Sequence, residues 1–315
     1  MIRTRSEWIS ILSLMLAMVL WASSFIALKL AFQTYDPMVV IFGRMSVASV
    51  FFLFFVKNCQ GSVYRKGDFK YLLFMAVCEP CLYFIFEARA IENTTASQAG
   101  MITAMLPLMV AVGAHLFLKE RVTKQTIAGF VLAILGACWL SMGSSPSHDA
   151  PNPLFGNFCE FMAMVFATGY TITLKRLTAR YNPLFLTAFQ AVTGTLFFLP
   201  FLFFGPTTLP TRFEWVPSLA IVYLGVFITF GAYGLYNYGV SRIPASQASS
   251  FVNLIPVFTI VMGWLVLGER FTASQYLASG LVFVGVFISQ ERKRSTEVSV
   301  DAEPKACCSA AKMMP

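Results

Sequence analysis

The sequence predicts an all-α polytopic membrane protein whose ten transmembrane helices form two inverted five-helix repeats. Three observations lead to this fold class: the composition, the lengths of the apolar runs, and a repeat at a fixed offset. Of the 315 residues, 57% are hydrophobic and 12% are charged, whereas soluble domains carry roughly 25% charged residues. This number of charged residues is too small to cover the surface of a soluble fold of this size. We therefore expect neither a soluble enzyme nor a nucleic-acid binder.

The apolar runs determine the expected number of spans. A helix needs about 20 apolar residues to cross a hydrocarbon core of roughly 30 Å. Ten runs approach or exceed this length, and charged or turn-forming residues separate them. In chain order the runs are 8–29, 37–57, 69–90, 95–118, 124–142, 154–175, 184–204, 215–239, 245–267 and 272–290.

The basic residues orient these spans. If the N-terminus is cytoplasmic, 18 of the 23 Lys and Arg residues fall on the cytoplasmic side, and Arg44 lies within a span. The external side receives only Lys29, Arg89, Arg212 and Arg270. This bias follows the positive-inside rule. We therefore expect a multi-pass protein of the plasma membrane, the inner membrane in a bacterium, with both termini in the cytoplasm.

An internal repeat divides the chain into two halves. Ala96-Ser97-Gln98-Ala99 recurs 149 residues later as Ala245-Ser246-Gln247-Ala248. The same offset relates four further pairs: Pro107 and Pro256, Glu120-Arg121 and Glu269-Arg270, Thr123 and Thr272, and Gly136 and Gly285. Since each half has an odd number of spans, the second half enters the membrane from the opposite side. We expect repeats over 1–143 and 154–291, followed by a disordered cytoplasmic tail, 292–315.

Inverted repeats favour transport. They let a carrier form inward-open and outward-open states of similar energy around a central site. No Gly-x-x-x-x-Gly-Lys-Ser/Thr sequence occurs, so we expect no transport driven by ATP on this chain. Because His115 and His148 are the only histidines, we expect no metal site. The sequence predicts a secondary transporter without a cofactor, not an enzyme.

The chain resembles the EamA domains of the drug/metabolite transporter superfamily over about residues 8–290. Each half contains a Pro-containing helix, a Glu-Arg turn and a Gly-rich final helix, and the first half carries Trp21-Ala22-Ser23-Ser24-Phe25 and Arg44. The resemblance implies export of amino acids or small metabolites through a central cavity, by proton coupling or exchange. The second half departs from the pattern, with Phe166-Ala167-Thr168-Gly169-Tyr170 in place of the Trp-containing run and Gln190 in place of the arginine.

Glu79 is the clearest candidate for a charged site residue. An ionisable group near the middle of the bilayer costs about 2.5–3.5 kcal/mol on insertion scales, and Pro80 predicts a kink beside it. Glu79 could couple protons or bind a substrate amine, or it could form an ion pair with Arg44 between helices. We expect Glu87 to be solvated near the external boundary, and Glu160 to be either interfacial or part of the site.

Uncharged residues complete the candidate site. Trp21, Tyr83 and Tyr170 lie well inside their spans and combine a polar edge with an aromatic ring, and Asn253 lies three residues before Pro256. We interpret all four as candidate substrate contacts. Pro107 and Pro256 occupy equivalent positions in the two halves, so we interpret them as kinks in paired gating helices.

The function predicted from these features is export of an amino acid or a related small metabolite by alternating access, with proton coupling as an option. One alternative is import or exchange of a nucleotide-sugar-like or cofactor-like solute, and another is a membrane sensor or scaffold without transport. The expected partners are a small-molecule substrate and the lipid bilayer, with no nucleic acid. Glycines in the last span of each half also allow a homodimer.

Overall fold

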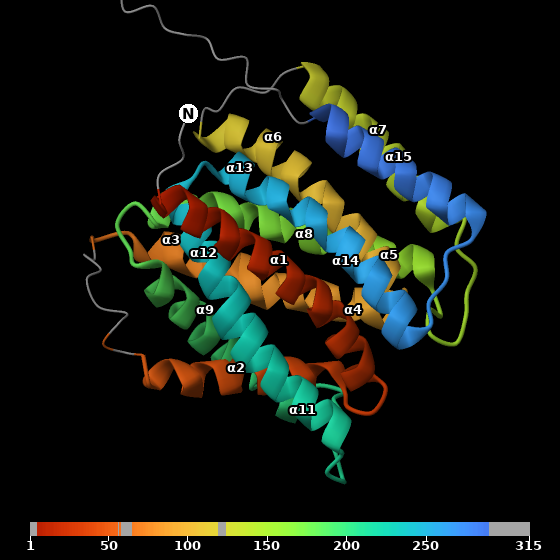
Figure 1. Cartoon of the computed structure of the whole chain (residues 1–315). Helices are drawn as coiled ribbons and strands as arrows, with labels where there is room; N and C mark the ends of the chain where they lie inside the picture. Colours follow the sequence, from red (N-terminus) through yellow and green to blue (C-terminus); the bar gives the residue numbers. More distant parts are fainter. Residues whose placement is uncertain (1–4, 56, 58–64, 119–123, 290–315) are drawn as a thin grey trace, which may run out of the picture.

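A computed structural model describes residues 5–55, 57, 65–118 and 124–289, and within these the regular elements are helices (Figure 1). Six helical stretches are long and apolar enough to cross a membrane: Trp8–Phe32, Phe69–Asn93, Ala96–Phe117, Pro183–Phe204, Trp215–Arg242 and Ala245–Leu267. The expected all-helical fold is confirmed, and the count of ten spans stays a prediction. The Glu120-Arg121 turn and the tail 292–315 lie outside the described residues.

The first half runs through α1 (Arg5–Phe32), α2 (Pro37–Leu53), α3 (Phe69–Ala76), η2 (Val77–Leu82), α4 (Tyr83–Asn93), α5 (Ala96–Ile102), η3 (Thr103–Met105), α6 (Leu106–Leu118) and α7 (Lys124–Met142). The second half runs through α8 (Pro153–Leu177), α9 (Pro183–Phe198), α10 (Phe201–Phe204), α11 (Trp215–Tyr223), η4 (Leu224–Ala232), α12 (Tyr233–Arg242), α13 (Ala245–Ser249), η5 (Ser250–Asn253), α14 (Leu254–Met262), η6 (Gly263–Leu267) and α15 (Ala273–Ser289). The η segments are turns of 3₁₀-helix, which is narrower than an α-helix, or of π-helix, which is wider, and they join consecutive α-helices.

Equivalent turns begin the second helix of each half. The side chain of Asp36 accepts a hydrogen bond from the backbone N–H of Met38 at 2.9 Å and caps α2, and Pro37 occupies the first helical position. Asn182 and Pro183 do the same for α9. A short oxygen-bearing side chain satisfies a free N–H of the first turn, and proline there loses no helical hydrogen bond.

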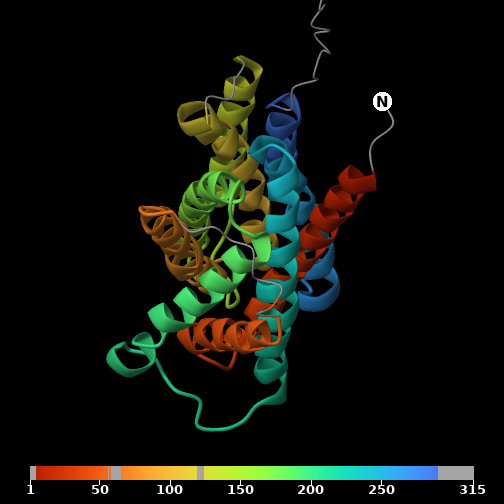
Figure 2. The same cartoon turned by 90° about the vertical axis from the view of Figure 1, so that its left-hand side faces the viewer.

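The two halves interlock by exchanged contacts. Helix α4 of the first half packs against α8 of the second, and α12 of the second packs against α1 of the first. The equivalent helices α2 and α9 contact each other, as do α7 and α15, which lie side by side at one edge of the bundle (Figure 1). This is the pattern of a two-fold relation between the halves. Figure 2 shows the bundle from the side, with the connection from α10 to α11 below it.

Two glycines allow α7 and α15 to approach closely. A Cβ added at Gly285 would lie 2.6 Å from the backbone oxygen of Gly129, and one added at Gly136 would lie 2.8 Å from the Val282 side chain. These distances are shorter than any normal contact, so larger residues would separate the helices. In this structure the glycine spacing therefore packs two helices of the same chain.

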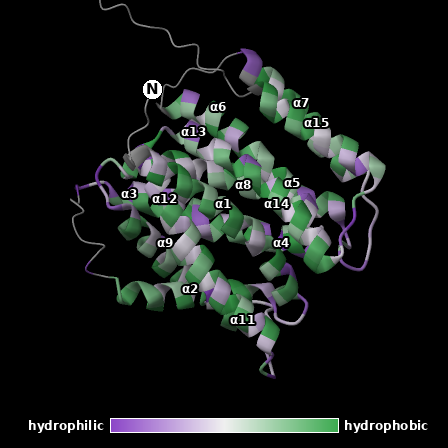
Figure 3. Cartoon of the chain, viewed as in Figure 1, coloured by the Kyte–Doolittle hydropathy of each residue, from purple (hydrophilic) through white to green (hydrophobic). Residues whose placement is uncertain are grey.

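The outer surface carries many exposed apolar side chains. Phenylalanine, leucine and valine side chains are exposed around the helices, and Phe204 is 91% exposed. Hydrophobic residues predominate along most of the helices (Figure 3). An exposed apolar surface of this extent is typical of a protein whose solvent is lipid.

Candidate functional site

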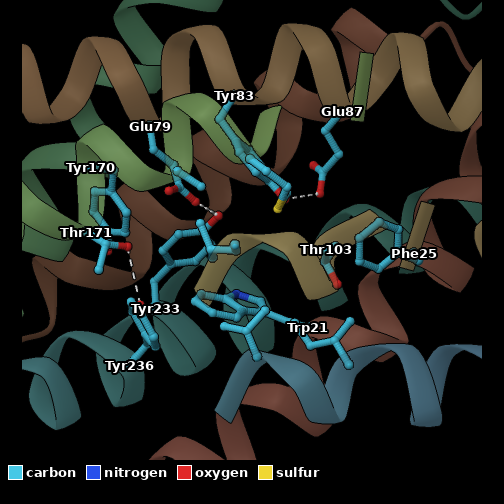
Figure 4. Close-up of a pocket in the computed structure, with 15 residues that line it drawn as sticks. Trp21, Phe25, Glu79, Tyr83, Glu87, Thr103, Tyr170, Thr171, Tyr233 and Tyr236 are labelled. Carbon is cyan, nitrogen blue, oxygen red and sulfur yellow. Dashed lines mark hydrogen bonds between the residues drawn. The ribbon is translucent and has the colours of Figure 1, made fainter. Parts of the chain in front are cut away.

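A small cavity lies between the two halves. Its volume is about 40 Å³, which is room for a few water molecules. Residues of α1, α4, α6, α8, α12, α14 and the turns beside them form its wall (Figure 4). The lining residues are Trp21, Phe25, Glu79, Tyr83, Glu87, Thr103, Leu106, Met164, Ala167, Tyr170, Thr171, Tyr233, Tyr236, Val252 and Ile255. A solute larger than water requires these walls to separate.

A break in the helix places Glu79 at this central cavity. The backbone of Glu79 is extended (φ −149°, ψ 116°) between helical neighbours, and Pro80 supplies no backbone N–H. The side-chain amide of Gln190 donates to the Glu79 carbonyl at 2.9 Å, and the Tyr233 hydroxyl donates to the Glu79 carboxylate. Gln190 on α9 thus supplies a hydrogen bond to the Glu79 carbonyl at the break, and Tyr233 on α12 orients the Glu79 carboxylate.

Arg44 forms its ion pair with Glu87. Its Nη1 lies 3.7 Å from Glu87 Oε2, its Nε donates to Thr229 Oγ1 at 3.2 Å, and the guanidinium lies 4.2 Å from the centre of the Phe84 ring. Tyr83 donates its hydroxyl to Glu87 at 3.0 Å. The sequence-based alternative of a direct ion pair between Arg44 and Glu79 is therefore not what the structure forms.

The expectation that Glu87 is solvated is wrong. Glu87 is 5% exposed and lines the central cavity. Helix α4 continues to Asn93, so Glu87 lies six residues, about 9 Å, before its end. Glu160 is fully buried, and neither of its carboxylate oxygens has a hydrogen-bond partner among the described residues. This burial disfavours an acid that reaches the membrane surface, but Glu160 is also absent from the lining of the central cavity, so its role stays a prediction.

A hydrogen-bond network extends from the cavity wall. The Tyr170 hydroxyl donates to Asn237 Oδ1. The Asn237 amide donates to Thr187 Oγ1 at 2.9 Å and lies 3.4 Å from Gln190 Oε1. Because Gln190 also binds the Glu79 carbonyl, the network joins α8, α9 and α12 to the broken helix. The backbone of Glu79 is therefore connected by hydrogen bonds to three helices of the second half.

Trp21 offers the cavity an unpaired donor. Its ring centre lies 5.1 Å from that of Tyr233 and 4.8 Å from that of Tyr236. The indole N–H is buried and has no hydrogen-bond partner among the residues that the structure describes. In Figure 4 the indole lies beside the open space of the cavity. A buried donor without a partner costs free energy, and an acceptor on a bound solute would recover it.

The remaining predicted residues lie away from the cavity wall. Asn253 lines a separate groove with Phe283 and Phe287, and its amide has no hydrogen-bond partner within the described ranges. Pro107 follows the tight turn η3, and Pro256 lies just after η5. The two prolines thus occupy equivalent breaks. Their gating role stays a prediction.

Two lysines form equivalent clasps at the ends of α1 and α8. Lys29 donates to the carbonyls of Ile91 and Thr94 at 2.7 and 2.9 Å, and also to that of Asp149. We call this set the α4 clasp. It ties α1 to the C-terminal end of α4, where carbonyl groups lack helical partners.

The matching set in the other half is the α12 clasp. Lys175 donates to the carbonyls of Val240 and Ile243 at 2.8 and 2.7 Å. These carbonyl residues lie 149 positions after those that Lys29 binds. Glu269, from the Glu-Arg turn of the second half, adds a contact on the α4 side, where it accepts from the backbone N–H groups of Ala96 and Ser97 at 2.9 Å.

The sequence reasoning missed the clasps and the cavity tyrosines Tyr233 and Tyr236 as site residues. A signal for the lysines existed, because Lys29 and Lys175 share the 146-residue offset of Tyr35-Asp36-Pro37 and Tyr181-Asn182-Pro183. The tyrosines carry the same signal as Trp21 and Tyr170, a polar edge on an aromatic ring within an apolar run, but the sequence does not separate those that line the cavity from those that do not.

Known proteins match this chain over most of its length. The sequence profile of the EamA-like transporter family matches residues 8–142 and again 154–289. The uncharacterized transporter YetK of Bacillus subtilis is 26% identical over 301 residues, covering 93% of this chain and 90% of YetK. An uncharacterized transporter of Archaeoglobus fulgidus is 28% identical over 275 residues, covering 87% of this chain and 96% of the relative.

Two further matches bear on substrate and on fold. A probable terminal-alkyne amino-acid exporter of Streptantibioticus cattleyicolor is 24% identical over 283 residues, covering 89% of this chain and 93% of the exporter. A protein of known crystal structure has the same fold, with a TM-score of 0.65 at 17% identity, covering 91% of this chain and 98% of the other.

Proposed function

Because the chain belongs to the EamA-like transporter family, and is thus a multi-pass membrane transporter rather than an enzyme, we propose that it exports an amino acid or a related small amphipathic metabolite. The proposed mechanism is secondary transport by alternating access between two inverted halves. The proposed location is the plasma membrane, the inner membrane in a bacterium, with both termini in the cytoplasm.

The chemistry of the central cavity is the observation that carries this proposal. Glu79 and Glu87 supply carboxylates, Trp21 supplies an unpaired N–H, and the other lining side chains are mostly aromatic or aliphatic. A solute with an ammonium group, a hydrogen-bond acceptor and an apolar side chain complements all three features. The similarity to a probable terminal-alkyne amino-acid exporter supports the same solute class.

The same chemistry disfavours an anionic solute of the nucleotide-sugar or cofactor kind. Such a solute needs several cations at the cavity wall. Among the described lining residues there is no lysine or arginine, and Arg44, behind the wall, is paired with Glu87. An acid-lined cavity would repel a phosphate.

The two clasps support alternating access. Both are formed in this structure, and the central cavity is small, so the conformation is closed around the site. Because the α4 clasp and the α12 clasp join different helix pairs, one can open while the other holds. Release of the α4 clasp would open one side of the membrane, and release of the α12 clasp would open the other.

Glu79 is the proposed point of proton coupling. Glu79, Glu87 and Glu160 are three buried carboxyl groups, and Arg44 is the nearby guanidinium. One guanidinium balances one carboxylate, so another carboxylate at this depth requires a proton or a solute cation. Proton and solute amine would then compete for Glu79, which is the basis of an antiport cycle.

Flux into proteoliposomes tests the proposal. The purified chain is reconstituted, a pH gradient is imposed, and radiolabelled amino acids are screened for uptake and counterflow. We expect gradient-driven uptake of at least one amino acid, and loss of both this uptake and counterflow in Glu79→Gln, because the solute amine and the proton share this carboxylate. Glu92→Gln is the matched control, since Glu92 pairs with Arg89 near the end of α4, outside the cavity.

Two outcomes would contradict parts of this proposal. Gradient-driven flux of equal size in Glu79→Gln and in the unaltered protein would remove proton coupling from Glu79. Uptake of sugar nucleotides, with no amino acid transported, would reject the solute class and leave the transporter fold untouched.

A further inference from the structure

Another hollow lies on the outer surface, between α3, α6 and α8. Its volume is about 450 Å³, and its phenylalanines Phe74 and Phe117 are exposed on the outside of the bundle. We call it the basic groove, and it is lined by Lys70, Tyr71, Phe74, Phe117, Gly169, Ile172, Thr173 and Arg176. None of these residues lines the central cavity.

Two cations stand at one end of the basic groove. The Lys70 ammonium lies 5.0 Å and the Arg176 guanidinium 4.2 Å from the centre of the Tyr71 ring. Neither cation forms an ion pair with a carboxylate in the described part of the chain. The nearby acid Asp68 is occupied, because Arg180 and Tyr181 both donate to it at 3.2 Å. The two positive charges beside the Tyr71 ring therefore have no neighbouring carboxylate to balance them in the described part of the chain.

The rest of the groove is apolar and extends toward the middle of the bundle. Phe74 lies one turn beyond Lys70 on α3, and Gly169 lies seven residues before Arg176 on α8, about 10 Å along the helix. Phe74 is 52% exposed and Phe117 is 74% exposed. Gly169 contributes no side chain and so deepens the hollow beside Phe74.

We propose that the basic groove binds an anionic phospholipid of the cytoplasmic leaflet. The lipid phosphate lies between Lys70 and Arg176, and an acyl chain follows the apolar surface past Phe74 and Ile172. The positive-inside bias puts the charged end of the groove at the cytoplasmic interface. Basic pockets between membrane helices at this interface suit anionic headgroups.

The combination of two cations with an apolar wall favours an anionic phospholipid over other ligands. A soluble phosphate would use the cations but leave the apolar wall exposed. A zwitterionic lipid would bring its own cation beside Lys70 and Arg176. The proposal rests on the membrane location of the chain and does not depend on which solute is transported.

The site also has a consequence for the transport machinery. Helix α3 leads directly into the turn that carries Glu79, and Gly169 directly precedes Tyr170 of the cavity wall. A lipid held between α3 and α8 therefore fixes the spacing of two elements that form the central cavity.

Native mass spectrometry tests the proposal. The detergent-purified chain is mixed with equal amounts of phosphatidylglycerol and phosphatidylcholine that carry identical acyl chains, and the bound lipid is counted. Since one cation near a charged membrane surface changes binding about fivefold, two should favour phosphatidylglycerol by about 30-fold. We expect this preference in the unaltered protein and its loss in Lys70→Gln/Arg176→Gln.

Matched variants separate the groove from general charge effects. Lys124→Gln/Arg242→Gln removes the same net charge on the same expected side, and Arg242 also lies over a tyrosine ring, at 5.1 Å from that of Tyr238. We expect this control to keep the preference. Lys70→Arg/Arg176→Lys retains both charges and should also keep it. If the double variant is not recovered folded, each single variant should lose about fivefold.

Several results would overturn the proposal. Equal binding of the two lipids by the unaltered protein would reject anionic selectivity. If Lys124→Gln/Arg242→Gln lost the preference for phosphatidylglycerol to the same extent, the total basic charge of this side, and not the groove, would cause it. Displacement of the lipid by millimolar glycerol 3-phosphate would assign the cations to a soluble phosphate. A dimer that forms only when the groove residues are intact would assign the surface to a second copy of the chain.

Discussion

Replacing Lys29 by methionine removes the ammonium donor of the α4 clasp and leaves a side chain of similar length. In the closed conformation the carbonyls of Ile91 and Thr94 then lose bonds of 2.7 and 2.9 Å. In a conformation open on that side, the same carbonyls face water whether or not the lysine is present. The substitution therefore raises the free energy of the closed state and leaves that of the open state almost unchanged.

The magnitude follows from the number of bonds. A hydrogen bond to a charged group contributes about 1.5–3 kcal/mol net. The bonds to Ile91 and Thr94 alone, without the one to Asp149, give at least about 3 kcal/mol, which corresponds to roughly a 150-fold shift toward the open state. Lys175→Met removes two bonds of 2.8 and 2.7 Å from the α12 clasp. It should produce a shift of similar size toward the opposite opening.

Cysteine accessibility measures both shifts. Thr103 lines the central cavity, so Thr103→Cys is introduced after the seven native cysteines have been replaced. Membrane-impermeant maleimide is applied to right-side-out and to inside-out vesicles. Lys29→Met should raise labelling from the external side at least tenfold, and Lys175→Met should raise it from the cytoplasmic side. Arg89→Met, which breaks an exposed ion pair on α4, should change neither.

The refuting results are specific. If both lysine variants increase labelling from the same side, the clasps are not opposing closures. If neither variant changes labelling, the clasps do not determine which side of the cavity is open. An effect of Arg89→Met as large as that of Lys29→Met would show that any loss of charge on this side disturbs the closure.

Three further predictions concern the buried charges, the solute contact and the helix packing. Arg44→Gln should lower the unfolding free energy in detergent by about 3–5 kcal/mol because it leaves Glu87 without its counter-charge. Arg44→Gln/Glu87→Gln should recover most of that loss, and a double variant no more stable than the single one would contradict this. Trp21→Phe should raise KM about tenfold with kcat nearly unchanged, because one hydrogen bond to the solute is lost; an unaltered KM would exclude the contact. Gly285→Ala should destabilise the chain by about 1–3 kcal/mol, whereas Gly280→Ala, where an added Cβ meets nothing within 4 Å, should not, and the reverse order in a thermal denaturation series would refute the packing argument.

The all-helical membrane fold was predictable because it depends on local pattern. Run lengths and turn residues lie adjacent in sequence, and the capped turns at Asp36 and Asn182 behave as their sequence suggests. Glu79 was recognisable as an ionisable residue next to a proline in an apolar run. Each of these features is determined within a few residues and needs no knowledge of how helices face one another.

The pairings were not predictable, because they depend on helix rotation. The break at Glu79 changes the direction of the helix before Glu87, so counting residues along one straight helix cannot assign the partner of Arg44. The two lysine clasps could not be predicted from the sequence repeat for another reason. The lysines recur at an offset of 146, whereas their carbonyl partners recur at 149. A comparison at one fixed offset therefore never aligns both members of the interaction.

The exchanged contacts between the halves also determine how the chain must be assembled during synthesis. Helix α4 has α8 as a partner, and α7 has α15, so the first half leaves the ribosome with its main contact surfaces uncovered. We therefore expect it to remain unassembled in the membrane until the second half is translated. A gene split within the connection between Met142 and Pro153 should therefore yield two fragments that are each degraded alone and stable when co-expressed.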